Sequence, residues 1–203
     1  MCSPISVGRY QMGSAALPGQ GLALFAGGVD YLNSYSAVVD VYNVVTNTWS
    51  TAALSESRAY LSAAALPEQG LAFFGGGYGP RYSSATVDIY NAVSRNWTTA
   101  VLSLARDSLT AVALPLQGLV MFAGGSSDAL DRSRLISSAV DIYNASSRTW
   151  TVSNMSTPRW RFASAVLPAQ GLAYFGGGLD INQDMFDVLD VYNASSEIGR
   201  AHV

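Results

Sequence analysis

The chain has 203 residues, of which 49% are apolar and 12% are charged, and its formal net charge is −3. A chain of this length buries enough of its surface to form a hydrophobic core. The small negative charge argues against nucleic-acid binding and against attraction to an anionic membrane. No apolar stretch approaches the roughly 20 residues needed to span a bilayer, so we expect no membrane insertion.

The scarcity of cysteine and histidine restricts metal chemistry. Cys2 is the only cysteine, which excludes an internal disulfide and a thiolate metal cluster, and His202 is the only histidine. We therefore expect no metal site and no cofactor. Residues 1–10 show neither the charged region nor the apolar run that is typical of a secretory signal, and the localisation is left open.

Four segments of the chain align without gaps over twenty residues. The period is 48 or 49 residues, and 53 where the third unit is longer. The segments read RYQMGSAALPGQGLALFAGG from Arg9, RAYLSAAALPEQGLAFFGGG from Arg58, RDSLTAVALPLQGLVMFAGG from Arg106 and RWRFASAVLPAQGLAYFGGG from Arg159. Such self-similarity at a fixed period indicates a repeat architecture.

Each repeat predicts four short strands, described here in the order of the first unit. Residues 9–17 form a first strand rich in small side chains. The turn at residues 18–21 reads Pro-x-Gln-Gly, in which Pro presets φ and Gly accepts a positive φ. A second strand ends at a Gly-Gly doublet, a variable loop follows, and residues 37–43 alternate as a third strand. The fourth strand lies around Trp49, and no window has the period of a helix.

Four-stranded units of about 45–50 residues are typical of the blades of a β-propeller. We predict an all-β fold of four consecutive four-stranded antiparallel blades, formed by residues 7–55, 56–103, 104–156 and 157–196. The small side chains of the first strands suit the crowded positions nearest the propeller axis. The innermost strands should therefore lie within residues 9–17, 58–66, 106–114 and 159–167.

A Gly-Gly doublet after an aromatic-bearing strand, followed by Tyr and then by Trp at a fixed spacing, resembles the kelch repeat. The resemblance covers about residues 7–196, with four copies in register. The chain departs from the kelch pattern in two respects: an Asn follows the Tyr where kelch units often have Asp, and a Phe stands before the glycines. The resemblance implies a kelch-type propeller whose partners bind at the face formed by the variable loops.

The register of the repeat predicts that the chain is part of a larger propeller. The Trp of each unit precedes the next repeated Arg by nine residues, and the same count back from Arg9 ends just before Met1. Near the other end, Gly199 stands where a Trp is expected. Residues 197–203 (EIGRAHV) are what GAGATCGGAAGAGCACACGTC encodes, a string that resembles a sequencing-library adapter. We expect an open arc whose remaining blades are missing, with a non-native tail at residues 197–203.

The two ends of the predicted blades differ in sequence. In a blade whose strands alternate in direction, the segment that enters the first strand and the loop after the second strand lie on one face. That face carries the variable segments VDYLNSYS, YGPRYSS, SSDALDRSRLISS and LDINQDMF, whereas the Pro-x-Gln-Gly turns opposite are nearly identical. Variable loops on a rigid scaffold often carry function, so we expect a protein or an acidic ligand to bind there.

Arginines on the variable face are the candidate binding residues. A ring of repeated guanidinium groups at the mouth of the channel would suit a carboxylate or phosphate. Alternatively, each repeated Arg pairs with a repeated Asp or with a carbonyl group and serves the fold. Residues that are not repeated are individually better candidates. The candidates are Arg9, Arg58, Arg106 and Arg159 in the repeat, and Arg81, Arg132, Arg134, Trp160 and Arg161 outside it.

Another repeated charge is the Asp of the third strand, at Asp40, Asp88, Asp141 and Asp190. One carboxylate per blade is spread around the ring, whereas glycoside hydrolysis needs two carboxylates within about 5–9 Å. We therefore expect structural hydrogen bonds from these residues, and we predict no catalytic residue. If the protein is secreted, the candidate N-glycosylation sites are Asn96, Asn144, Asn154 and Asn193.

Two classes of function fit the sequence. The first is a non-catalytic protein-interaction or ligand-binding scaffold of kelch type, acting through the variable loop face. The alternative is a propeller enzyme acting on a sugar, such as a mutarotase-like epimerase, which needs only a few polar residues at the mouth of the channel. A kelch-type copper-radical oxidase is disfavoured, because its copper needs histidine ligands and His202 lies in the tail.

Overall fold

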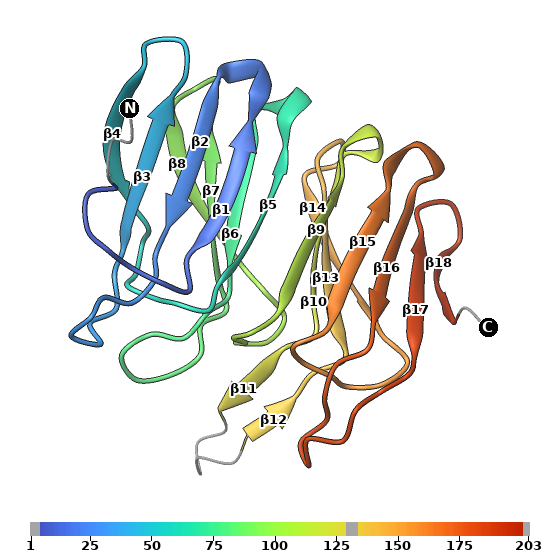
Figure 1. Cartoon of the computed structure of the whole chain (residues 1–203). Coiled ribbons are helices and arrows are strands. Elements are labelled where there is room, and N and C mark those ends of the chain that lie inside the picture. Colours follow the sequence, from blue (N-terminus) through green and yellow to red (C-terminus); the bar gives the residue numbers. More distant parts are fainter. Residues whose placement is uncertain (1–4, 129–133, 201–203) are drawn as a thin grey trace.

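The structure is a computed structural model that describes residues 5–128 and 134–200. In those residues the fold is all-β, with one antiparallel four-stranded sheet from each repeat and one additional two-stranded hairpin (Figure 1). Within the same ranges, no helix has both the length and the apolar character needed to cross a membrane. The predicted all-β class and the four antiparallel four-stranded units are confirmed.

Every repeat folds into its strands in the predicted order. The first sheet comprises β1 (Gly13–Leu17), β2 (Leu22–Ala26), β3 (Val38–Asn43) and β4 (Thr48–Ala53). The second comprises β5 (Ser62–Leu66), β6 (Leu71–Gly75), β7 (Thr86–Asn91) and β8 (Asn96–Val101). The third comprises β9 (Thr110–Leu114), β10 (Leu119–Ala123), β13 (Ala139–Asn144) and β14 (Thr149–Asn154). The fourth comprises β15 (Ala163–Leu167), β16 (Leu172–Gly176), β17 (Leu189–Asn193) and β18 (Glu197–Arg200).

The Pro-x-Gln-Gly turns form short 3-10 helices, as η1 (Pro18–Gln20) illustrates. Gly21 follows with φ 66°, and its N–H donates to the carbonyl oxygen of Pro18 at 3.0 Å. This left-handed conformation strains a residue that has a side chain, and a Cβ on Gly21 would lie 2.9 Å from Val45. The turns of the other units have the same geometry, with η2 (Pro67–Gln69), η3 (Pro115–Gln117) and η4 (Pro168–Gln170). The predicted role of the turn glycine is therefore confirmed.

The variable segment of the third unit differs from the loop that the sequence predicted. There, β11 (Ser126–Asp128) and β12 (Arg134–Ile136) pair as a hairpin, with Asp128 opposite Arg134. The sequence alone did not reveal this hairpin. The hairpin projects from the lower end of the molecule in Figure 1. Arg132, a predicted binding residue, lies outside the described residues.

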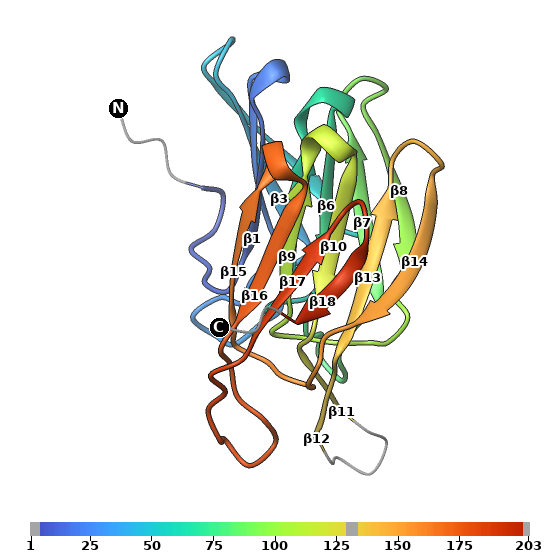
Figure 2. The same cartoon turned by 90° about the vertical axis from the view of Figure 1, so that its right-hand side faces the viewer.

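The hydrophobic core lies between neighbouring sheets. Three apolar clusters join units one and two, units two and three, and units three and four. The first strands pack against one another in the order β1, β5, β9 and β15, as expected for innermost strands. On the outer face of unit four, Leu167 is 46% exposed, whereas its counterparts Leu17, Leu66 and Leu114 are fully buried. The sheets therefore stand in an open series (Figures 1 and 2).

The last strand of unit four completes its sheet with a shifted register. In unit one Tyr42 stands opposite Trp49, whereas in unit four Tyr192 stands opposite Ile198. The shift arises because residues 194–196 join β17 to β18, one residue fewer than the 44–47 turn of unit one. Residues 197–200 thus form a strand that lacks the Trp of the other units.

Candidate functional site

The variable segments gather at one end of the molecule. In Figures 1 and 2 they lie at the lower end, together with the residues that enter each first strand, and the Pro-x-Gln-Gly turns lie at the upper end. We call the lower end the loop face and the upper end the turn face. The loop face comprises residues 29–36, 78–84, 126–128, 134–138 and 179–186.

The four repeated arginines enter the first strands beside the loop face, and their side chains are buried. Each donates a hydrogen bond to the Asp of the third strand in its own unit. The pairs are Arg9–Asp40, Arg58–Asp88, Arg106–Asp141 and Arg159–Asp190. In every unit the backbone N–H of the serine three residues before the Arg donates to the same carboxylate.

Arg106 shows why this arrangement serves the fold. Its fully buried guanidinium donates to the carbonyl oxygens of Gly124 (3.1 Å) and Ala139 (2.6 Å) as well as to Asp141. Burial lowers the pKa of Arg106 below that of a free arginine, and Asp141 opposes the shift. Buried charges require such partners. The structural interpretation of the repeated Arg and Asp residues is confirmed, and these arginines do not form an open guanidinium ring.

A second repeated feature, which the sequence analysis did not identify, lies two residues after each repeated Arg. The backbone there is left-handed although none of the residues is glycine. The residues are Gln11 (φ 58°), Tyr60 (φ 56°), Ser108 (φ 51°) and Arg161 (φ 53°). A side chain in this conformation costs roughly 1–2 kcal/mol, which glycine avoids.

Backbone hydrogen bonds link the left-handed residues of units one to three, but they do not involve the side chains. The N–H of Tyr60 donates to the carbonyl oxygen of Gln11 at 3.0 Å, and the N–H of Ser108 donates to Tyr60 at 3.1 Å. These bonds link successive units, and glycine would make them equally well. The presence of side chains at these strained positions therefore indicates that the side chains have a function.

Three of the four strained residues line a single cavity of about 320 Å³ on the loop face. The lining residues are Tyr35, Tyr60, Tyr78, Asp107, Ser108, Asp128, Arg134, Trp160 and Arg161. We call this space the Trp160 cavity. It brings together three predicted binding residues, Arg134, Trp160 and Arg161, of which Arg134 comes from the hairpin of unit three.

Two arginines lie against the ring of Trp160. The guanidinium carbons of Arg134 and Arg161 are each 4.3 Å from the ring centroid, so the two cationic groups lie close to each other. Trp160 is almost fully buried, and its Nε1–H donates to the carbonyl oxygen of Asp180 at 3.3 Å. A guanidinium that stacks on an aromatic face keeps the N–H groups along its edge for an acceptor.

The charged side chains around the cavity differ in how many hydrogen bonds and ion pairs they make. The buried carboxylate of Asp107 accepts hydrogen bonds from the hydroxyl groups of Ser83 (3.0 Å), Ser108 (2.8 Å) and Ser126 (3.1 Å). Arg134 contacts Asp107 at 3.5 Å, a long ion pair. Arg161 is exposed, and within residues 5–128 and 134–200 it makes no hydrogen bond or ion pair. Of the two arginines of the Trp160 cavity, Arg161 is therefore the more available to a ligand.

Tyrosines form the aromatic part of the wall. The rings of Tyr35 and Tyr78 lie with their centroids 6.0 Å apart. Burial raises the pKa of Tyr35, and the neighbouring Tyr60 acts in the same direction. Burial also raises the pKa of Tyr78, to which a hydrogen bond with Asp128 contributes. Both phenols therefore stay neutral and present hydroxyl groups beside apolar ring faces.

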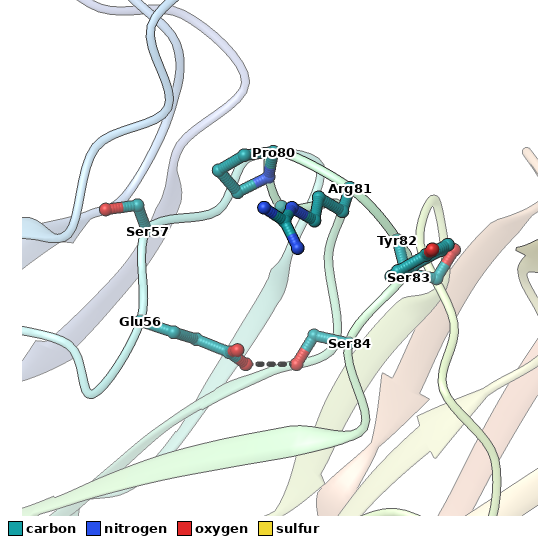
Figure 3. A pocket seen from close by; sticks show the side chains of 8 residues that line it. Glu56, Ser57, Pro80, Arg81, Tyr82, Ser83 and Ser84 are labelled. Carbon is teal, nitrogen blue, oxygen red and sulfur yellow. Dashed lines mark hydrogen bonds between the residues drawn. The ribbon is translucent and has the colours of Figure 1, made fainter.

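Arg81, another predicted binding residue, lies in a separate hollow of the loop face. This hollow has a volume of about 470 Å³ and lies between residues 79–84 and residues 56–57. The hydroxyl group of Ser84 donates to the carboxylate of Glu56, and Figure 3 shows Arg81 across the hollow from this bond. Glu56 also accepts a hydrogen bond from Arg58 at 3.3 Å. The hollow thus places opposite charges on facing sides.

The four asparagines of the glycosylation motifs lie at strand ends. Asn96 and Asn154 are exposed, whereas Asn144 and Asn193 are half-buried. The side-chain oxygen of Asn144 accepts hydrogen bonds from the backbone N–H groups of Ser146 (2.9 Å) and Ser147 (3.2 Å), which shapes the turn. Among the described residues, no group of three or more His, Cys, Asp and Glu side chains gathers in a metal-binding arrangement.

The other six lining residues of the Trp160 cavity were not predicted from the sequence: Tyr35, Tyr60, Tyr78, Asp107, Ser108 and Asp128. The available signal was their place beside the repeated landmarks. Asp107 and Tyr60 follow a repeated Arg by one and two residues, and Tyr78 follows a Gly-Gly doublet, at positions where each unit carries a different residue. Neither a protein-family model nor a curated protein matches the chain, so its function is inferred from its own residues.

Proposed function

We propose that the chain forms four consecutive blades of a kelch-type β-propeller and acts as a non-catalytic scaffold that binds an acidic partner at the Trp160 cavity. One observation carries this proposal. Tyr60, Ser108 and Arg161 come from three successive units, all have left-handed backbones, and all line the same cavity. Backbone strain that is kept at a cavity is typical of a binding site.

The chemistry of the cavity favours a carboxylate as the acidic group. Arg161 lacks a hydrogen-bond partner in the described chain, and Arg134 stacks on Trp160 and makes a long ion pair with Asp107. A guanidinium edge donates two parallel hydrogen bonds to one carboxylate. Tyr35 and Tyr78 provide ring faces beside this group, against which the apolar part of a Glu or Asp side chain can pack.

An extended protein segment suits the loop face better than a small acid. Ser83 lines the hollow that contains Arg81, and its hydroxyl group donates to Asp107 of the Trp160 cavity. The two depressions are therefore neighbours on one face. We therefore propose that a peptide with one carboxylate at Arg161 places a second one at Arg81.

Peptide selection against the immobilised chain tests the proposal. We expect the selected peptides to be enriched in Glu and Asp, and we expect the enrichment to vanish when Arg134→Gln and Arg161→Gln are combined. Arg95→Gln with Arg148→Gln is the matched control, because these two arginines are also exposed and left-handed (φ 58° each) but lie in hairpin turns of the turn face. Equal enrichment by both double variants would contradict the proposal.

The sugar-enzyme alternative predicts a different outcome. A mutarotase-like protein accelerates the interconversion of sugar anomers, and its turnover would depend on a polar cavity residue such as Asp107. We expect no acceleration above the uncatalysed rate for common pyranoses. Acceleration that Asp107→Asn abolishes would overturn the non-catalytic assignment.

A further inference from the structure

Unit two carries an acidic side chain that the other units lack. Glu56 lies two residues before the repeated Arg58, and the corresponding residues of the other units are Val7, Leu104 and Thr157. The ion pair between the repeated Arg and Asp forms in those units without an acid at this position. Glu56 therefore stands outside the repeat, which makes it a candidate for binding.

The surroundings of Glu56 hold one more negative charge than the matching places in the other units. The buried guanidinium of Arg58 pairs with Asp88 and also contacts Glu56 at 3.3 Å, so one cation faces two carboxylates. In units one, three and four the repeated Arg pairs with one carboxylate in the described chain. The side chain of Glu56 is 45% exposed, so the additional negative charge lies at the surface.

One oxygen of the Glu56 carboxylate is available to a ligand. Both hydrogen bonds that Glu56 accepts, from Arg58 and from the hydroxyl group of Ser84, end on Oε1. Within residues 5–128 and 134–200, Oε2 accepts no hydrogen bond. An ionised carboxylate has about four acceptor positions, so Oε2 can accept a hydrogen bond from a donor that enters the hollow.

Arg81 provides the positive charge of the same hollow. Its side chain is exposed, and in the part of the chain that the structure describes it makes no hydrogen bond or ion pair, with Glu56 or with any other residue. Figure 3 shows Arg81 across the hollow from the bond between Glu56 and Ser84. The volume of about 470 Å³ falls within the range of about 300–1,000 Å³ that is typical of ligand sites.

We propose that this hollow binds a lysine of the partner segment at Glu56, beside the carboxylate that Arg81 binds. The lysine site rests on the proposed function, because the second carboxylate of the acidic peptide lies at Arg81. That carboxylate faces Glu56 across the hollow, and a cation between the two offsets the repulsion of like charges. Pro80 and Tyr82 line the hollow and offer apolar surface to the alkyl stem of the lysine.

The carboxylate geometry favours lysine over arginine. A guanidinium fork binds best to two carboxylate oxygens at once, whereas an ammonium group makes a point contact. Since Oε1 of Glu56 already accepts two hydrogen bonds, Oε2 alone is left for the ligand.

Peptide selection with two further variants tests the lysine site. We expect peptides selected on the wild-type chain to be enriched in Lys as well as in Glu and Asp, and we expect Glu56→Gln to lose the Lys enrichment alone. The amide oxygen of Gln still accepts from Arg58 and Ser84, and circular dichroism checks the fold. Glu68→Gln is the matched control, because Glu68 is exposed in η2 of the same unit, on the turn face.

Calorimetry then measures the contact with one selected peptide. Its Lys→Gln version should bind the wild-type chain about three- to tenfold more weakly, as expected for a partly exposed ion pair, and should bind Glu56→Gln as well as the parent peptide does. An equal loss with both proteins would show that the lysine does not bind Glu56, and it would overturn the proposal.

The selection also separates this proposal from the proposed function. Acidic enrichment without Lys enrichment on the wild-type chain overturns the lysine site and leaves the acidic-partner site standing, whereas absence of acidic enrichment overturns both. Equal enrichment of Arg and Lys overturns the choice of lysine.

Zero-length crosslinking gives an independent readout. These 203 residues contain no lysine, so a carbodiimide can join the peptide lysine to a carboxylate of the chain without competition from lysines of the chain. We expect mass spectrometry to find the amide bond at Glu56. Equal yield at Glu68, or no product at Glu56, would contradict the site.

Discussion

Replacement of one buried arginine should show how strongly the repeated ion pairs hold each unit together. In Arg106→Met the apolar stem is kept, but the carbonyl oxygens of Gly124 and Ala139 lose a donor and Asp141 loses its cation. Breaking a buried pair from one side typically costs about 3–5 kcal/mol of unfolding free energy, because an uncompensated charge remains buried. We expect a loss in this range.

The loss should shrink when the stranded charge is also removed. Asp141→Asn retains an acceptor for the N–H of Ser103, so Arg106→Met combined with Asp141→Asn should cost less than the sum of the two single changes. Arg9→Met should fall at the lower end of the range, because Arg9 donates to Ser36 and Asp40 and to no carbonyl oxygen in the described chain.

Urea unfolding followed by tryptophan fluorescence measures these differences through the linear dependence of the free energy on denaturant. Arg95→Met is the matched control, since Arg95 is exposed, and it should change the stability by less than about 0.5 kcal/mol. The reasoning is refuted if Arg106→Met costs less than about 1 kcal/mol, or if the two single losses simply add.

Three further predictions follow from the same geometry. Arg161→Gly removes the left-handed strain together with the side chain, so the unfolding free energy should stay within about 1 kcal/mol of wild type while acidic-peptide binding is lost; a larger destabilisation would show that the residue serves the fold. Gly76→Ala should destabilise by at least about 2 kcal/mol in urea unfolding, because φ is 64° and the new Cβ would lie 2.5 Å from a backbone oxygen of the next unit; a neutral result would contradict this packing. The pKa values of Tyr35 and Tyr78 are raised in the folded protein, so the two phenols stabilise the fold fully below pH 10.0 and lose this effect as the pH rises through their folded pKa values. In an ultraviolet titration, Tyr35→Phe and Tyr78→Phe should each remove part of the increase in phenolate absorbance at the highest pH; loss of the increase near pH 10.0 instead would contradict the raised pKa values.

The repeat made most of the fold predictable. Four copies of one pattern placed the strands, because each landmark has a local physical cause: Pro18 and Gly21 define a turn, and the alternation of residues 37–43 defines a half-buried strand. The pairing of the repeated Arg and Asp was also predictable in kind, because a charge repeated in every unit serves the unit. The hairpin of unit three was not, because it departs from the repeat.

The candidate site was predictable only in part. Arg134, Trp160 and Arg161 were identified because they are charged or aromatic and not repeated, but nothing in the sequence shows that they meet at one ring. Their meeting depends on the curvature of the series of sheets, which brings different units to one cavity. The left-handed backbone at Tyr60 was also hidden, since tyrosine at a positive φ runs against local preference.

The interaction between Arg161 and a partner carboxylate is the central claim, and a double-mutant cycle across the interface tests it most directly. Calorimetry would measure binding of one selected acidic peptide and of its Glu→Gln version to the wild-type chain and to Arg161→Gln. We predict that the two changes are coupled by about 1.5–3 kcal/mol, the range for a hydrogen bond to a charged group. If the effects add without coupling while both proteins stay folded, the peptide carboxylate does not bind Arg161 and the proposed site is wrong.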